Sequence, residues 1–328
     1  MRWLRKLGNV VLVANSVLAL AAHAQDPATT YPNRAIRVVV PYPPGGTSDT
    51  LMRLIGQKLT ERWGQQIVIE SRPGGAALIG TEVVARAQPD GYTLLATDMG
   101  SVLISWLSHA KPSFDYLRDL TPVMVIAYSP HVLCVHPSLP VRTPKELIAL
   151  AKQRPGQLNY AGALAGASIM AGIDFAQRAG IQWAYITGRG GMQTVMDVVT
   201  GQADMFFNGM LPTVPHIQSA RLRLLAVSSD KRVERFPNAP TVAESGMPGF
   251  LTGSWQGLLA PAGTPPEIVT KLHAEISRAL KLPDVIQRLS VLGTEPRYSS
   301  PGDTAREMQS ERERMAKLIR DTRFKPGQ

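Results

Sequence analysis

Two kinds of hydrophobic pattern alternate along the chain. Short runs of β-branched and other apolar residues predict buried strands, and segments with apolar residues every three or four positions predict helices with one buried face. The expected strands are residues 36–40, 67–70, 93–96, 122–128, 132–135, 182–186, 203–207, 222–228 and 255–260. Between the first two strands, the spacing of one helical face is followed by Leu51, Leu54, Ile55, Leu59 and Trp63. Strands that alternate with helices favour an α/β fold with a mainly parallel sheet.

The C-terminal part of the chain has a different pattern. Three helices are expected over residues 265–280, 283–292 and 301–320, and each has a proline near its start. Proline is favoured there because the first turn of a helix does not use its backbone N–H groups. The last of the three is rich in charged residues, which is typical of a solvated amphipathic face.

The first 24 residues have the pattern of an export signal. Three basic residues near the start precede an apolar run over residues 10–22, and Ala22-His23-Ala24 has the small residues of a cleavage site. The run is shorter than the about 20 apolar residues that a membrane-spanning helix needs. We therefore expect export to the periplasm, with cleavage after Ala24.

The remaining chain of about 300 residues is long enough to divide into two domains. We expect residues 25–128 and 226–328 to form domain 1 and residues 129–225 to form domain 2. The apolar runs at 122–135 and 222–228 are the best candidates for strands that cross between the domains as a hinge. The C-terminal helices can pack on either domain.

Charge and cysteine content exclude two classes of protein. Removal of the signal lowers the net charge from +10 to +7, because Arg2, Arg5 and Lys6 leave with it. The other basic residues are dispersed, with no run of five, so a nucleic-acid partner is not expected. Cys134 is the only cysteine, which excludes an intrachain disulfide, and its apolar surroundings are typical of a buried strand.

Four expected strand-to-helix junctions share glycines, small residues and hydroxyls. They are "PYPPGGTSD" (41–49), "ATDMGS" (96–101), "AGALAGAS" (161–168) and "TGRGG" (187–191). Such a junction places free backbone N–H groups and the positive end of a helix dipole at the carboxyl edge of the sheet, where α/β folds bind ligands. In the first junction, Gly45 and Gly46 permit close backbone approach, and Thr47 or Ser48 can cap the helix. One such loop is explained as an ordinary capped turn, whereas four favour an anion site.

Other kinds of chemistry lack their motifs. No lysine follows the glycines as in a nucleotide phosphate loop, and Ser168 lacks the second glycine of a hydrolase nucleophile turn. The histidines show no metal-ligand spacing, so neither a metal nor another cofactor is expected. Backbone donors and hydroxyls with few acids or bases are typical of a site that binds a molecule without transforming it.

Seven stretches carry a family resemblance. They are "YPNRAIRVVVPYPPGGTSD", "VIESRPGGAALIG", "AQPDGYTLLATD", "LNYAGALAGAS", "GRGGMQTVMDVVTGQADMFF", "RLRLLAVSSDKRVERFPNAPTVAESGMPGF" and "GLLAPAGTPPEIVTKL". In this order they resemble the Bug family of extracytoplasmic solute receptors, the substrate-binding components of tripartite tricarboxylate transporters. The resemblance implies a two-domain periplasmic binding protein, type II-like, with a hinged cleft. It also implies no enzymatic activity, a small organic acid as ligand, a membrane permease as partner, and a monomer.

The resemblance further implies which residues contact the ligand, largely through backbone N–H groups and hydroxyls. In domain 1 they are Tyr42, Gly45, Gly46, Thr47, Ser48, Asp49, Thr97 and Asp98. In domain 2 they are Gly162, Ala163, Gly166, Ala167, Ser168, Tyr185, Arg189 and Gly190.

The loop of domain 2 departs from the family pattern. Gly162 stands where the family has serine, and Ile169 or Met170 stands where it has histidine. Fewer polar groups favour an acid with an apolar or aromatic body, because unpaired polar groups are unfavourable to bury. The alternative is that Leu164, Ile169 and Met170 pack beneath the loop.

Two other functions stay open. A periplasmic hydrolase or isomerase acting on a carboxylate would need Asp49, Asp98 or Ser168 as its base or nucleophile. A sensor module of a two-component system would share the same binding chemistry and would need a partner kinase.

Overall fold

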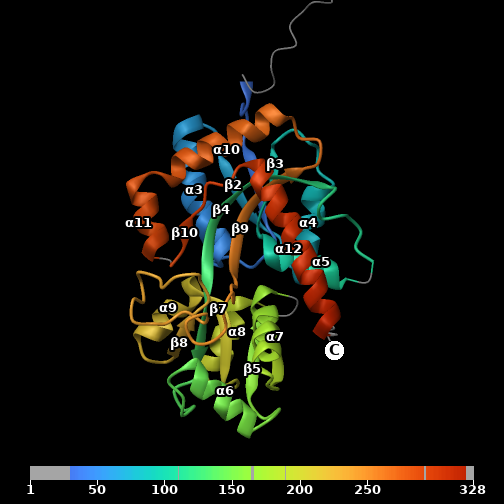
Figure 1. The fold of residues 1–328 in the computed structure, drawn as a ribbon. Helices are drawn as coiled ribbons and strands as arrows, with labels where there is room; N and C mark the ends of the chain where they lie inside the picture. The colour runs from blue at the N-terminus through green and yellow to red at the C-terminus, as the bar shows by residue number, and fades with distance from the viewer. Residues whose placement is uncertain (1–29, 110, 164–165, 189, 292, 323–328) are drawn as a thin grey trace, which may run out of the picture.

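A computed structural model describes residues 30–109, 111–163, 166–188, 190–291 and 293–322 (Figure 1). The predicted signal segment, residues 1–24, therefore lies outside the described residues. The elements form two halves, which lie one above the other in Figure 1. We call residues 30–128 and 253–322 the first half and residues 129–252 the second half. Among the described helices, none combines the length and the apolar character needed to cross a membrane.

The first half is built on a mixed sheet in the order β2-β1-β3-β9-β4. Its strands are β1 (Ile36–Val40), β2 (Ile67–Ser71), β3 (Thr93–Asp98), β9 (Gly253–Pro261), the start of β4 (Leu120–Val135), and β10 (Glu295–Pro296), which pairs with β4. β1 pairs in parallel with β2 and β3, whereas β9 is antiparallel to both β3 and β4.

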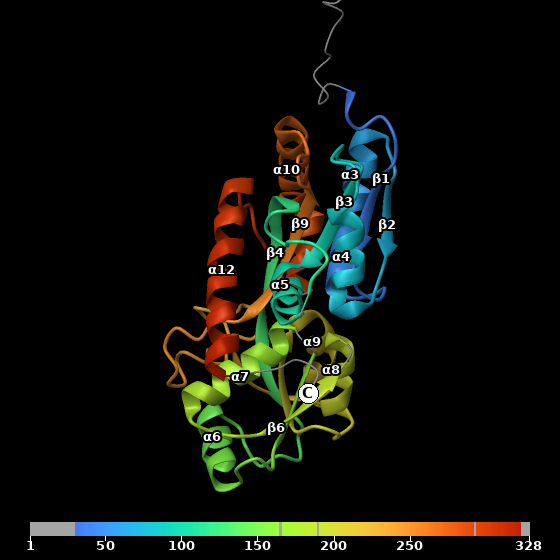
Figure 2. The ribbon, with the colours of Figure 1, turned by 90° about the vertical axis from the view of Figure 1, so that its right-hand side faces the viewer.

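Helices cover both faces of this sheet. One face packs against α3 (Thr47–Trp63), α10 (Pro266–Leu280) and α11 (Pro283–Val291) in one apolar cluster. The other face packs against α4 (Leu78–Ala85), which follows the short 3-10 helix η1 (Gly75–Ala77), and against α5 (Met99–Ser108) and α12 (Pro301–Thr322). Figure 2 accordingly shows α3 and α12 on opposite sides of β4 and β9.

The second half is a smaller α/β unit. Its strands are the end of β4, β5 (Asn159–Ala163), β6 (Ala184–Gly188), β7 (Met205–Gly209) and β8 (Arg223–Val227). β5 is parallel to β6 and β7, whereas β4 is antiparallel to β7 and β8. α6 (Pro144–Gln153) and α7 (Ala167–Ala179) pack in one apolar cluster, and α8 (Gly191–Val199) and α9 (Met210–Gln218) pack in another.

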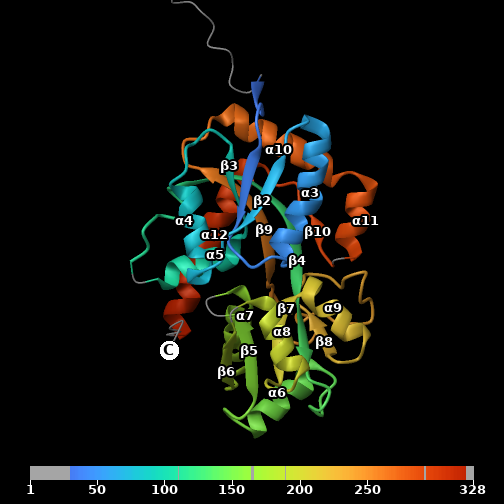
Figure 3. The same cartoon turned by 180° about the vertical axis from the view of Figure 1, so that it is seen from behind.

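Strand directions bring the helix starts of both halves together. β4 runs from the first half into the second, and β3 runs in the same direction because both strands are antiparallel to β9. β1, β2 and β3 therefore point towards the second half. β7 is antiparallel to β4, so β5, β6 and β7 point towards the first half. The helices that follow these strands begin where the halves meet, and Figure 3 shows α7, α8 and α9 directly below the first half.

The chain passes between the halves along β4 and returns at Thr252 and Gly253, where β9 begins. Side chains of the segment before this return pack in the core of the second half, namely Ala226, Val242, Met247 and Phe250. The segment from Ala226 to Phe250 therefore packs with the second half. The C-terminal α12 contacts both halves, because Met308 packs on the first sheet and Met315 packs against α7.

Most predicted elements are present with ends shifted by a few residues. Three expectations differ from the structure. The sheet is mixed instead of mainly parallel, because β4 and β9 pair antiparallel with their neighbours. Residues 122–128 and 132–135 belong to the single strand β4, and residues 159–163, which were not expected as a strand, form β5.

Candidate functional site

Glycines precede four of the helices that begin where the halves meet. α3, α7, α8 and α9 have Gly46, Gly166, Gly190 and Gly209 as their N-caps, and these glycines supply no side-chain cap. At α7, the first N–H group has a partner from the other half, because Ala167 N donates to Ser101 Oγ. The first N–H groups of a helix have no partner within it, and the helix dipole adds positive charge at this end. Both halves therefore present uncapped donors that can hold an anion. Gly209 was not among the predicted site residues.

α5 begins at the same place but is capped by the protein itself. The Asp98 carboxylate accepts a hydrogen bond from Ser101 N at 3.1 Å and another from Ser254 Oγ at 2.5 Å. Burial raises the pKa of Asp98 above its ordinary value, and the hydrogen bonds that it accepts oppose this shift. A carboxylate of the chain thus already occupies the start of α5, and the predicted Asp98 contact would have to use its backbone.

The loop after β1 exposes its two glycines and buries the side chains of Ser48 and Asp49. Gly45, in the left-handed region at φ 83°, and Gly46 are both exposed. Ser48 Oγ donates to Gln256 Oε1 at 2.5 Å, and Thr47 is the first helical residue, so the prediction that Thr47 or Ser48 caps α3 was wrong.

Asp49 is held within the same loop. Its carboxylate accepts from Gly45 N at 3.0 Å and from Arg53 at 2.9 and 3.0 Å. Burial works against the ionised form, but the hydrogen bonds from Arg53 and Gly45 lower the pKa of Asp49 overall. Asp49 is therefore an ionised, paired group that orders the loop.

A buried chain of hydrogen bonds joins the starts of α3 and α5. Ser48 donates to Gln256, Gln256 Nε2 donates to Ser254 Oγ at 2.5 Å, and Ser254 donates to Asp98. Gln256 is only 2% exposed, so these contacts fix the two helix starts relative to β9. Sequence reasoning missed Ser254 and Gln256, although two polar residues on one face of an apolar strand were a usable signal.

Tyr42 and Thr97 support the same loops from behind. The Tyr42 hydroxyl lies 3.1 Å from Thr97 Oγ1 and donates to the Asp98 carbonyl at 3.3 Å. Burial raises the pKa of Tyr42 above its ordinary value, so the phenol is neutral. Thr97 is 1% exposed, and its side chain supports the loop instead of facing an open surface.

In the second half, the loop between β5 and α7 is also closed by internal bonds. Ser168 Oγ accepts from Ala163 N at 2.9 Å, and the Ser168 carbonyl accepts from Tyr160 at 2.6 Å. Gly162 passes so close to Ile169 that a Cβ would lie 2.9 Å from its side chain. The serine expected there in the family would not fit this packing.

The next two helix starts are linked by Asn208. Its Nδ2 donates to the Gly191 carbonyl at 2.7 Å, and its Oδ1 accepts from Gly209 N at 2.8 Å. Tyr185, on β6, is 38% exposed and packs edge-on against Tyr160, and the Gly190 carbonyl accepts from Thr194. The predicted contact Arg189 lies outside the described residues.

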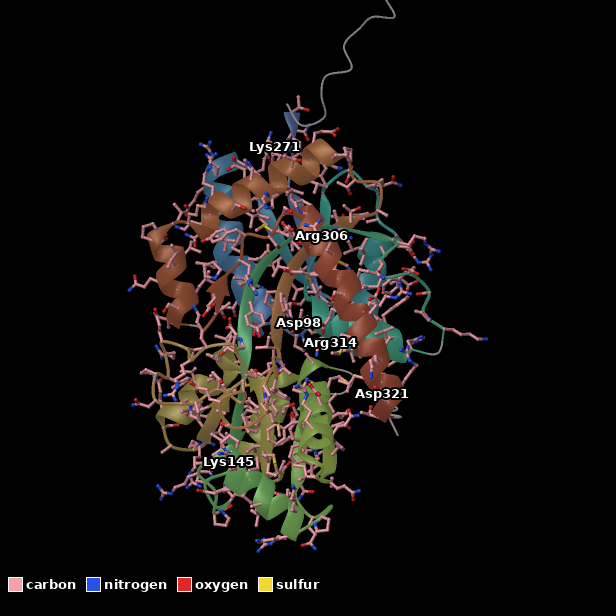
Figure 4. All side chains as sticks on the ribbon, viewed as in Figure 1. Asp98, Lys145, Lys271, Arg306, Arg314 and Asp321 are labelled. Atoms are coloured by element: carbon pink, nitrogen blue, oxygen red, sulfur yellow. The ribbon has the colours of Figure 1, made fainter. Side chains whose placement is uncertain are left out.

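The halves touch directly between α5 and α7. Ala167 N donates to Ser101 Oγ at 3.3 Å, and Ile104 of α5 packs with Ile169, Met170 and Met315. Ile169 and Met170 are buried in this cluster, so the packing interpretation holds for both, whereas Leu164 lies outside the described residues. Figure 4 shows Asp98 near this junction and Lys145 far from it, at the other end of the second half.

The described residues include no group of three or more His, Cys, Asp or Glu side chains that could hold a metal ion. The arrangement offers neutral N–H donors from both halves, with its nearby carboxylates already paired. It is suited to holding an anion between the halves.

Comparison with known proteins supports this interpretation. A family model described as "Tripartite tricarboxylate transporter family receptor" matches residues 51–324. Protein BugT of Bordetella pertussis is 35% identical over 298 residues, which cover 90% of this chain and 91% of BugT. The solved structure of R. palustris Rpa4515 with adipate has a TM-score of 0.84 at 33% identity, covering 89% of this chain and 98% of that one. MatC from Rhodopseudomonas palustris with bound malate has a TM-score of 0.80 at 30% identity, covering 88% and 100%. The fold is thus that of the two-domain periplasmic solute-binding proteins.

Proposed function

This chain belongs to the tripartite tricarboxylate transporter receptor family, and we propose that it captures one small organic acid between its halves and delivers it to a membrane permease. Proteins of this family are periplasmic solute receptors and not enzymes. The proposal concerns the ligand, the residues that hold it and the partner of this particular chain.

The observation that carries the proposal is the set of uncapped glycine N-caps. Gly46 belongs to the first half, and Gly166, Gly190 and Gly209 belong to the second. A carboxylate at these helix starts would accept hydrogen bonds from N–H groups that have no partner within their helix, and at α7 it would compete with Ser101 for Ala167 N. The adipate in Rpa4515 and the malate in MatC, two similar structures, support a carboxylate as the bound group.

Neutral donors also fit the task of a transport receptor. A salt bridge to a buried arginine would make release of the acid difficult, because a buried charge left without its partner is strongly unfavourable. Backbone N–H groups lose less interaction free energy when the acid departs, since water can take its place as the hydrogen-bond acceptor. The predicted contacts of Tyr42, Ser48, Asp49, Thr97 and Asp98 would then act mainly by shaping the loops.

We also propose that closure of the halves accompanies binding. A ligand drives closure only if it binds the closed state better than the open one, and donors from both halves provide that difference. The hinge would be formed by β4 and by the chain at Thr252 and Gly253. The first predicted boundary, between residues 128 and 129, would then stay. The second, predicted between residues 225 and 226, would move to a position near residue 252.

The same proposal includes export and a monomeric receptor. Removal of residues 1–24 after Ala24 would release the chain into the periplasm, where a permease can collect the loaded form. N-terminal sequencing of the exported protein tests the cleavage position, and sedimentation of the loaded receptor tests the monomer.

The acid itself is identified by two measurements. Mass spectrometry of small molecules released from natively purified protein would show which acid co-purifies. Calorimetric titration would then compare adipate, malate, citrate and benzoate, which differ in length, charge and aromatic character. Binding of at least one acid with one site per chain is expected, and a protein that binds none of the acids in either experiment would contradict the proposal.

The alternative of a hydrolase or isomerase finds no support in the geometry. Ser168 is 6% exposed and bonded to Ala163, and both Asp49 and Asp98 are occupied by hydrogen bonds. Recovery of unchanged acid after long incubation is expected. A sensor role would share the binding step. It would be shown only if the phosphorylation of a partner kinase depended on the acid bound to this protein.

A further inference from the structure

A cavity of about 230 Å³ lies beneath α12. It lies between α5, β4, β9 and α12 and is partly open. Its lining consists of Met99, Gly100, Leu103, Tyr116, Val125, Trp255, Glu307, Met308, Ser310 and Glu311. None of these residues is among the predicted acid contacts.

The cavity lies on the opposite face of the sheet from the polar chain that ends at α3. Side chains of a strand alternate between its two faces, so Trp255 points away from the face that carries Ser254 and Gln256. Trp255 packs in the cluster under α5 and α12, together with Val125 and Met308. An occupant of this cavity would therefore bind separately from an acid held at Gly46.

The walls of the cavity are apolar and adaptable over most of their area. Two thioethers, from Met99 and Met308, and two aromatic rings, from Tyr116 and Trp255, face the space. Methionine accommodates varied apolar shapes and contacts rings favourably. A cavity of about 150 Å³ can already hold benzene, so this one has room for an aromatic ring with a short side chain.

One end of the cavity carries a carboxylate without a partner. Glu307 Oε2 is buried, and within the part of the chain that the structure describes it has no hydrogen-bond partner. The neighbouring Glu311 differs, because Arg314 donates to both of its oxygens at 2.7 and 2.8 Å.

The positive charge of Arg297 offsets the effect of burial on the Glu307 carboxyl only in part. Its guanidinium lies over the rings of Tyr128 and Trp255, at 5.5 and 5.4 Å from their centroids. Burial raises the pKa of Glu307, and the charge of Arg297 lowers it by less, so the carboxyl stays above its ordinary value. Between the described residues, no ion pair or hydrogen bond joins Glu307 to Arg297 or to another cation.

We propose that this cavity is a second ligand site, which takes a small organic ammonium ion with an aromatic or branched apolar body. A carboxylate only accepts hydrogen bonds, so the group that completes Glu307 is a donor. An ammonium group supplies three N–H donors and the opposite charge, and the body of the ligand fills the space between Met99, Leu103 and Trp255.

The test uses phenethylamine hydrochloride titrated calorimetrically into the full mature protein. We expect one site with a dissociation constant of roughly 0.1–1 mM, as for a small ligand in a partly open cavity. 2-Phenylethanol has nearly the same body without the charge and is expected to bind at least about tenfold more weakly, since it offers one O–H donor and no positive charge to the Glu307 carboxylate.

Glu307→Gln keeps the shape of the side chain and removes its charge, so it should weaken phenethylamine binding by about tenfold or more. Glu313→Gln is the matched control, because Glu313 is exposed on the same helix and should leave binding unchanged. Glu307→Asp keeps the charge but shortens the side chain, and an intermediate affinity is expected. Circular dichroism confirms that each variant is folded.

Three outcomes would overturn the proposal: no binding heat up to about 10 mM amine, equal binding by 2-phenylethanol, or equal binding by Glu307→Gln. A fourth is competition, in which a saturating organic acid displaces the amine from one shared site. Gly46→Asp should leave amine binding intact, so failure of the acid site and failure of this site are distinguishable.

Discussion

Replacement of Gly46 by aspartate places a carboxylate where the organic acid is proposed to bind. Gly46 has φ −72° and ψ 175°, which any residue adopts, and a Cβ there would approach only the Pro43 carbonyl, at 3.6 Å. Aspartate at an N-cap accepts from the second or third N–H of the helix. It would thus do at α3 what Asp98 does at α5, where it accepts from Ser101.

The change should separate folding from binding. Aspartate in place of a glycine N-cap adds a few tenths of a kcal/mol, and its charge near the helix dipole adds about 0.3–1 kcal/mol. Repulsion from Asp49, which Arg53 neutralises in part, reduces this gain, so the free energy of unfolding should change by less than about 1 kcal/mol. A ligand carboxylate about 5 Å from the new charge is repelled by about 3 kcal/mol at an effective dielectric constant near 20. That repulsion corresponds to a loss of affinity of about 100-fold or more.

The assay is calorimetric titration with the acid identified by mass spectrometry, beside a urea unfolding curve for each variant. Gly46→Asn supplies the cap without the charge and should lose about tenfold, since it competes for the same N–H groups. Thr143→Asp controls for added charge, because Thr143 caps α6 by accepting from Glu146 N, beside Lys145 and far from the junction (Figure 4). A stable Gly46→Asp protein that binds the acid within about threefold of the wild type would refute the reasoning.

Three other changes test the supporting structure. Gln256→Leu removes the acceptor of the Ser48 hydroxyl and the donor to Ser254 Oγ, which keeps its bond to Asp98, so urea unfolding should show a loss of about 1–3 kcal/mol; an unchanged midpoint would contradict the buried hydrogen-bond chain. Asp98→Asn keeps an N-cap and removes a carboxyl whose pKa burial raises above 3.8. The folded wild type holds this proton more tightly than the unfolded chain, so its stability should fall as pH rises above about 3.8 until Asp98 is ionised in the folded state. Asp98→Asn should lack that part of the fall, and parallel stability curves for the two proteins would show that Asp98 does not contribute. Met315→Ala removes a side chain that is 2% exposed between α12 and α7, and should lower the free energy of unfolding by about 2–5 kcal/mol and increase the radius of gyration in X-ray scattering. A radius equal to that of the wild type would show that this cluster does not hold the halves together.

The sequence was a good guide where a local pattern determines structure. β1 follows from β-branched residues at every position of 36–40 except Arg37, and α10 follows from a proline start and a regular apolar face. β5 was missed because Asn159–Ala163 consists mostly of small residues, whose strand conformation depends on pairing with β6 and β7. β4 was divided in two because Pro130 interrupts the pattern, and proline normally weakens the expectation of a strand.

The helix starts that form the candidate site could be predicted from sequence, but their internal contacts could not. Gly-rich junctions identified the starts of α3, α7 and α8, because composition at a helix start is local. Ser48 was expected to cap α3, yet its hydroxyl bonds to Gln256, which is 208 residues away in the chain. Asn208 and Gly209 show the opposite case, since Asn-Gly before an apolar segment was a visible sign of another helix start.

The central claim is that backbone donors of both halves hold one organic acid between them. A crystal structure of the protein with its co-purifying acid tests it most directly. We expect one carboxylate oxygen within hydrogen-bond distance of N–H groups at the start of α3, and another polar group of the acid at the start of α7, α8 or α9. An acid bound by one half alone, held by side-chain cations, or found only in the cavity beneath α12 would contradict the account.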